Sequence, residues 1–112
     1  MTRAQIAGMI EAVGLPFAYD HFTKGEAPSG PPYICFLYPG RDDFAADDAN
    51  YARVTALQIE LYAREPDFTH EETLEAALTA AGLVYEKSGP GYIDEEKMYM
   101  TTYTTEVLLT YA

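Results

Sequence analysis

The sequence predicts an α+β domain, a two-layer sandwich in which two helices pack on one face of a mainly antiparallel sheet. Two segments have the apolar spacing of amphipathic helices, each with a start signal and a closing glycine. Several short runs have the composition or the alternation of strands, and short connections between them favour antiparallel pairing. Two helices can cover only one face of such a sheet. The expected order is α-β-β-β-α-β-β, in a single domain that spans residues 1–112.

The first helix is expected to begin at a capping box formed by Thr2 and Gln5, whose side chains satisfy free amides at the helix start. Its apolar residues have the i, i+3, i+4, i+7 spacing that places them on one face: Ile6, Met9, Ile10 and Val13. Gly14 then supplies the left-handed residue that commonly ends a helix.

Three strands are expected before the second helix. Residues 17–22 are predicted to be extended, and residues 24–32 form a surface connection rich in Gly and Pro. Residues 33–38 are apolar on both faces, which predicts a central strand. Residues 41–50 are acidic and are expected to form a loop. Residues 53–62 alternate between apolar and polar, so we expect three positions to face the core: Leu57, Ile59 and Leu61.

The second helix is expected to begin at another capping box, with Thr69 as the cap and Glu71 and Glu72 near the positive helix end. Its apolar stripe would be formed by Leu74, Ala77, Leu78 and Ala81, and Gly82 would close it.

The C-terminal part is expected to complete the sheet. We expect residues 83–86 to form a strand, residues 88–91 a turn and residues 92–94 a short return. The Thr- and Tyr-rich composition of residues 98–111 predicts a long strand. Its odd positions form the more apolar face: Tyr99, Tyr103, Val107, Leu109 and Tyr111.

The sheet face away from the helices is the first candidate for an interface. We expect it to carry Tyr38, Tyr62 and a row of threonines. Such a face is polar enough for solvent, yet it is rich in the aromatic residues that are common where proteins meet.

The charge is strongly acidic. Eighteen Asp and Glu face seven Lys and Arg, which gives a formal net charge of −11. This charge repels phosphate backbones and anionic lipids, so we expect no specific nucleic-acid binding and no membrane binding. It either keeps the protein in solution or lines a passage through which DNA slides without sticking. The sequence has neither a membrane-spanning apolar run nor a secretion signal, so we expect a cytoplasmic protein.

The sequence offers little for catalysis or metal binding. His21, His70 and the single cysteine, Cys35, lie far apart, whereas a metal site needs several converging ligands. We expect Cys35 to be a small buried packing residue. Asp20 and His21 are neighbours on an expected strand, where successive side chains point to opposite faces, which argues against a proton-transfer dyad. We therefore predict no enzyme, no cofactor and no metal.

The segment around Phe44 is the second candidate for an interface. Its acidic residues lack the alternating ligands, central Gly and distal Glu of a helix-loop-helix calcium site, which favours a solvated loop: Asp42, Asp43, Asp47 and Asp48. Exposing Phe44 in their midst is costly unless something covers it. Either this side chain folds back on the core or a partner buries it.

Four stretches carry a resemblance to a known family: Gly14-Leu15-Pro16-Phe17-Ala18-Tyr19-Asp20-His21-Phe22, Pro32-Tyr33-Ile34, Leu57-Gln58-Ile59-Glu60-Leu61-Tyr62 and Tyr85-Glu86-Lys87-Ser88. They resemble small tail-region proteins of long-tailed bacteriophages and prophages, and the order of elements is similar to that of tail terminator and tail completion proteins. The resemblance implies an α+β protein that forms a ring, typically a hexamer, on the last ring of the tail tube. Such a ring stops tube growth and presents the surface on which the head docks, while DNA passes through it.

The partners implied are further copies of the chain, the tail-tube protein and the neck proteins that connect head and tail. The protein would be made in the host bacterial cytoplasm and would reside in the virion. No functional residue transfers from the family, so the interface is predicted from exposure and chemistry alone: Arg41, Asp42, Asp43, Phe44, Asp47, Asp48, Tyr51, Tyr38 and Tyr62.

Other functions stay open at this point. Within the same class, the chain could be another neck or tail-tube component. An acidic inhibitor or DNA mimic would instead bind a basic partner through its carboxylates. A small enzyme that uses Asp20 and His21 is the third alternative.

Overall fold

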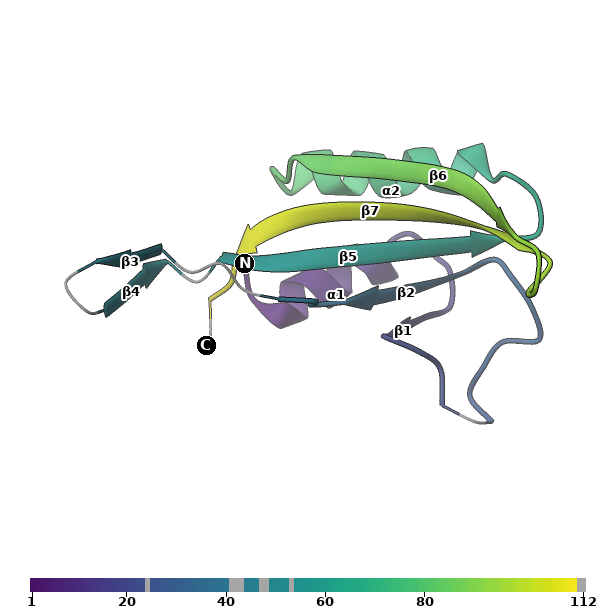
Figure 1. Cartoon of the computed structure of the whole chain (residues 1–112), viewed down its shortest axis with the longest axis horizontal. Helices are drawn as coiled ribbons and strands as arrows, with labels where there is room; N and C mark the ends of the chain where they lie inside the picture. Colours follow the sequence, from purple (N-terminus) through teal and green to yellow (C-terminus); the bar gives the residue numbers. More distant parts are fainter. Residues whose placement is uncertain (24, 41–43, 47–48, 53, 111–112) are drawn as a thin grey trace.

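The computed structural model describes residues 1–23, 25–40, 44–46, 49–52 and 54–110. Two helices, α1 (Arg3–Glu11) and α2 (Phe68–Ala80), cover one face of a five-stranded sheet of order β1-β2-β5-β7-β6 (Figure 1). Its strands are β1 (Phe17–Tyr19), β2 (Tyr33–Leu37), β5 (Val54–Ala63), β6 (Tyr85–Ile93) and β7 (Met98–Leu108). These elements follow the order α-β-β-β-α-β-β, which confirms the predicted α+β fold.

The core fills the layer between the helices and the sheet. Ile6 and Ile10 of α1 and Leu74 and Leu78 of α2 are fully buried there. They meet alternate residues of the inner strands: Ile34, Phe36, Leu57, Ile59, Leu61, Tyr103 and Val107. The alternation that predicted the core face of β5 is confirmed, because every second residue of this strand is buried.

The start of α1 is the predicted capping box. The Thr2 hydroxyl accepts a hydrogen bond from the Gln5 amide at 3.1 Å, and the Gln5 side chain accepts one from the Thr2 amide at 2.8 Å. Gly14 follows with φ +90, the left-handed conformation predicted for it.

The start of α2 corrects the prediction. Its N-cap is Asp67, not Thr69, and the Asp67 carboxylate accepts the His70 amide at 3.1 Å. Aspartate is at least as good a cap as threonine, so the helix starts at the earlier residue. His70 stays beside this cap, with Nδ1 2.6 Å from the second Asp67 oxygen.

The connection between β1 and β2 explains the one parallel pairing of the main sheet. Phe17 lies opposite Ile34 and Tyr19 opposite Phe36, in parallel register. A parallel pair needs a long connection, and residues 20–32 provide it. Strand β2 is thus an interior strand, as predicted, and β5 occupies the middle of the sheet.

The acidic segment contains a hairpin where a loop was predicted. Strands β3 (Phe44–Ala46) and β4 (Ala49–Ala52) pair antiparallel as a separate two-stranded sheet. This hairpin projects from the body near the start of β5 (Figure 1). The acidic composition indicated a loop, but antiparallel main-chain pairing does not depend on side-chain polarity and joins two short stretches that lie close in sequence.

Strand β6 is continuous where a turn and a short return were predicted. Gly89 has φ +98, and the register against β7 shifts between Ser88 and Gly91. Pro90 is tolerated because β6 is an edge strand, where an amide on the open side is not needed. The Gly-Pro pair therefore marks a bulge.

In the described ranges, neither helix has the length and apolar character needed to cross a membrane.

Candidate assembly surfaces

The open face of the sheet lies opposite α1 and α2. The strand register brings its residues into rows across β2, β5 and β7. One row joins Tyr33, Tyr62 and Met100, and the next rows are Cys35, Glu60 and Thr102, and Leu37, Gln58 and Thr104. Tyr62 and two threonines thus lie on this face as predicted.

Aromatic stacking and hydrogen bonds fix the side chains of the open face. The rings of Tyr33 and Tyr62 stack with centroids 4.9 Å apart, and Phe22 packs edge-on against Tyr33 at 5.5 Å. The Tyr62 hydroxyl donates to Glu60 Oε1 at 3.1 Å, and Gln58 Nε2 donates to Glu60 Oε2 at 3.0 Å. Burial, followed by the Glu60 charge, raises the pKa of Tyr62. The result is a preformed, partly aromatic surface that can contact another protein without reordering.

A hollow of about 400 Å³ lies beside the tyrosine stack. Its lining includes Cys35, Tyr62, Asp20 and His21. Burial, and then the carboxylates of Glu60 and Asp20, raise the pKa of Cys35 to about 11. The thiol is therefore protonated at neutral pH and is a poor nucleophile.

Asp20 and His21 do form a pair, which corrects the prediction that they point apart. His21 Nδ1 lies 2.8 Å from Asp20 Oδ2. Strand alternation does not apply here, because β1 ends at Tyr19 and Asp20 has a left-handed φ of 64. The side chains remain 73% and 55% exposed, so solvent screens the pair on both sides. The geometry gives it no buried environment of the kind that tunes a catalytic base.

Tyr38 lies on the helical side of the sheet, which corrects its predicted place on the open face. It follows Ile34 and Phe36 in the alternation and packs partly buried against the core. Its ring meets Tyr19 at 5.6 Å, and its amide donates to the Tyr19 hydroxyl at 3.1 Å.

Tyr38 borders a groove of about 750 Å³ between α1 and the neighbouring end of the sheet. We call it the α1 groove, and its lining includes Ala4, Ala7, Tyr19, Phe36, Tyr38 and Thr55. This lining is mainly apolar. Two buried hydroxyl oxygens here, Tyr38 Oη and Thr55 Oγ1, have no hydrogen-bond partner among the described residues.

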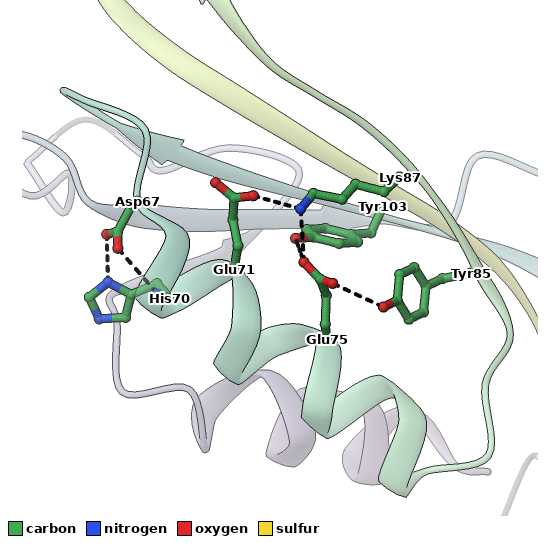
Figure 2. Close-up of polar contacts among 7 residues, drawn as sticks. All are labelled: Asp67, His70, Glu71, Glu75, Tyr85, Lys87 and Tyr103. Carbon is green, nitrogen blue, oxygen red and sulfur yellow. Dashed lines mark hydrogen bonds and ion pairs between the residues drawn. The ribbon is translucent and has the colours of Figure 1, made fainter.

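A charged cluster, in which Glu71 is buried and Lys87 and Glu75 are partly exposed, joins α2 to β6 and β7 (Figure 2). Lys87 Nζ lies 2.7 Å from Glu71 Oε1 and donates to Glu75 Oε2 at 2.9 Å. The hydroxyls of Tyr85 and Tyr103 donate to Glu75 at 3.1 and 2.8 Å. The Glu71 contact is an ion pair: within the described part of the chain, no donor meets hydrogen-bond geometry at Glu71 Oε1.

Glu71 was predicted to serve the helix start, yet its side chain is only 2% exposed and faces the sheet. The available signal was the i, i+4 spacing of Glu71 and Glu75, which places both carboxylates on one side of α2. The cluster is structural, since its groups bond one another, and only Tyr85 among them borders a described hollow.

The predicted acidic interface falls largely outside the described residues. This applies to Arg41, Asp42, Asp43, Asp47 and Asp48. Phe44 and Tyr51 have backbones in β3 and β4, but their side chains are not among those described. The structure thus brings Tyr62 to the open face and Tyr38 to the α1 groove, and it leaves the other candidates as predictions.

Within the described ranges, no three His, Cys, Asp or Glu side chains converge as metal ligands would. No protein-family model matches the chain, and a search of curated proteins gives no match.

Proposed function

We propose that the chain is a structural protein of a phage or prophage tail, a ring-forming tail terminator that caps the tail tube and presents the surface on which the head docks. The observation that carries this proposal is the open sheet face, where a preformed tyrosine stack and its neighbours have no helix over them. A surface of this kind suits a protein that works by contact with other subunits. The resemblance of four sequence stretches to tail-region proteins supplies the class of assembly.

The charge is compatible with this role. A formal net charge of −11 repels the phosphates of DNA, so a ring of such subunits lets DNA pass without retaining it. The proposed partners are further copies in a hexamer, the tail-tube protein and the neck proteins, and the proposed location is the virion. A neck or tail-tube component is the alternative within this class.

The same charge also favours an alternative function, that of an acidic inhibitor that binds a basic partner. Light scattering across a concentration series, with and without tail-tube protein, separates the two functions. A ring-sized mass, or rings formed only on addition of tube protein, is the expected result. A monomer at every concentration that ignores tube protein, yet binds a basic protein in a salt-sensitive way, would refute the terminator proposal.

A substitution tests the open face itself. Thr104→Arg places a long cation at an exposed position of this face, where it should block docking but not folding. Thr79→Arg, at an exposed position of α2, is the matched control. Loss of assembly in both variants, or in neither, would show that the open face is not the assembly surface.

A further inference from the structure

The hollow beside the tyrosine stack, which we call the tyrosine hollow, has walls of two chemical kinds. Its lining includes three aromatic rings and two carboxylates: Phe22, Tyr33, Tyr62, Asp20 and Glu96. Asp20 follows β1, and Glu96 lies in the turn between β6 and β7. Both are exposed, so a bound group can reach them from solvent. At about 400 Å³, the hollow has room for one long side chain.

Contacts within the lining hold the rings in place. The rings of Tyr33 and Tyr62 stack with centroids 4.9 Å apart, and Phe22 packs edge-on against Tyr33. The Tyr33 hydroxyl donates to Met98 Sδ at 3.6 Å, which ties β2 to the start of β7. Because these rings are already ordered, a ligand that packs against them does not have to order them first.

The hollow attracts positive charge. Burial, followed by Cys35 and Glu96, raises the pKa of Tyr33, so the Glu96 charge acts at the ring stack. The described lining contains no Lys or Arg. The Arg64 guanidinium lies against Gly30 but borders a separate hollow. A cation that enters the tyrosine hollow therefore meets carboxylates and aromatic rings, and both attract it.

The rest of the open face has the same sign. The strand register places three further carboxylates on it: Glu60, Glu86 and Glu106. Among the described residues of β2, β5, β6 and β7, no Lys or Arg lies on this face. Like charges opposed across an interface are unfavourable. The open face is therefore ill-suited to pack against the same face of a second copy, and its charge fits a basic surface.

We propose that the open face docks a basic surface of a protein partner, and that an arginine of this partner enters the tyrosine hollow, where its guanidinium meets the Asp20 and Glu96 carboxylates and the tyrosine rings. Arginine suits this lining better than lysine, because its planar group stacks on rings and donates in more than one direction. This inference rests on the proposed function, since it names the chemistry of the partner that the open face contacts.

Three tripeptides test the ligand chemistry. Each has glycine on both sides of a central arginine, lysine or citrulline, the last being the uncharged isostere of arginine. NMR titration follows the ring protons of Tyr33 and Tyr62 at about pH 8, where an ordinary imidazole is neutral and His21 adds no positive charge to the lining.

The arginine peptide should shift these ring signals and bind roughly threefold or more tightly than the lysine peptide, and more tightly still than the citrulline peptide. Equal binding of the lysine peptide would show that charge alone attracts the ligand. Equal binding of the citrulline peptide would show that no cation is needed. Either result would overturn the proposal.

A matched pair of variants tests the site. Glu96→Gln removes one carboxylate of the lining with little change of size, and it should weaken binding of the arginine peptide by about twofold to fivefold. Glu86→Gln, which is also exposed and lies on the open face but outside the lining, should keep the affinity of the parent protein. Both variants should keep its urea midpoint. Equal affinities in all three proteins would exclude the hollow as the arginine site.

The outcomes separate this inference from the proposed function. A chain that assembles with tail-tube protein but does not bind the arginine peptide overturns the inference and leaves the terminator proposal standing. A chain that binds the peptide at the hollow but ignores tail-tube protein keeps the inference and refutes the terminator proposal. Choline that binds the hollow more tightly than the arginine peptide would identify a free small cation as the occupant, which would also overturn the inference.

Discussion

Lys87 is the only cation in the cluster between α2 and the sheet, and it serves two carboxylates. The contacts with Glu71 and then Glu75 raise the pKa of Lys87, so it stays charged at neutral pH. Its Nζ also lies 5.8 Å from the centre of the Tyr103 ring. Glu71 depends on this lysine, because a buried carboxylate without its partner is strongly unfavourable.

Lys87→Met should therefore destabilise the protein by about 3 kcal/mol, since it leaves Glu71 buried and unpaired. Urea unfolding measures this change. Lys97→Met, in the turn between β6 and β7, should change stability by no more than about 0.5 kcal/mol. The double variant Glu71→Met with Lys87→Met should regain most of the loss. A single variant as stable as the control would contradict the assigned role of Lys87.

Glu75 gives stability a pH dependence. Burial raises the pKa of its carboxyl, but the hydrogen bonds from Lys87, Tyr103 and Tyr85 outweigh burial and hold the pKa below the ordinary 4.5. A carboxyl with a lowered folded pKa stabilises the fold above its unfolded pKa, and this contribution is lost as the pH falls through the folded value.

We expect the urea midpoint to fall below about pH 4.5. Glu75→Gln should lower the midpoint at neutral pH and flatten its decline in acid. Glu72→Gln, at an exposed position of the same helix, should keep the slope of the parent protein. Parallel acid profiles for the parent protein and Glu75→Gln would rule out this contribution.

Among the elements, β6 depends on the conformation of a single glycine. A Cβ added to Gly89 would lie 2.7 Å from the Met100 carbonyl oxygen, and its φ of +98 disfavours other residues. Gly91 lies two residues away and has nothing within 4 Å of such a Cβ. Gly89→Ala should cost at least about 2 kcal/mol in thermal or urea unfolding, because strain and steric overlap add. Gly91→Ala should cost far less, and equal losses would be inconsistent with the bulge.

Strand β5 offers an independent comparison between its two faces. Ile59 is fully buried, so Ile59→Ala should cost about 2 to 5 kcal/mol. Gln58 lies next to it on the open face, where Gln58→Ala should cost about 1 kcal/mol or less through its bond to Glu60. A reversed order of losses in urea unfolding would mean that the faces are assigned wrongly.

The elements that the sequence predicted best are those with a long, local pattern. β5 and β7 alternate over many residues, and α1 carries its cap and its apolar face within one short segment. β6 was missed because a Gly-Pro pair is typical of turns, while its edge position makes a bulge acceptable.

The candidate site was harder to predict, because its contacts join distant residues. Tyr38 was predicted to lie on the open face. The alternation that puts Phe36 on the helical side continues past the end of β2, so Tyr38 lies on the helical side as well. The ion pair between Glu71 and Lys87 links two elements, and neither residue has a local pattern that names the other.

At the scale of the whole molecule, the extents of 50 × 28 × 25 Å describe an elongated particle. The projecting hairpin contributes to the long axis (Figure 1). If subunits join at such an extremity, as the proposed function requires of this segment, the core of neither is disturbed, and folding and assembly should be separable.

A combined variant tests this separation: Phe44→Ala together with Ser at Asp42, Asp43, Asp47 and Asp48. It should keep the unfolding midpoint of the parent protein and lose ring or particle formation, as seen by light scattering and electron microscopy. Normal assembly by the variant would exclude this segment as an interface, and a lower midpoint would show that the segment supports the core.

The bulge in β6 also bears on fibre formation. A straight edge strand presents an unbroken row of amides and carbonyls on which strands of other molecules can stack. In β6, Pro90 lacks an amide hydrogen, and the register shift between Ser88 and Gly91 divides the edge into two short runs. Each run is shorter than the about six or seven residues typical of a cross-β segment, so this edge is a poor template for strands of other molecules.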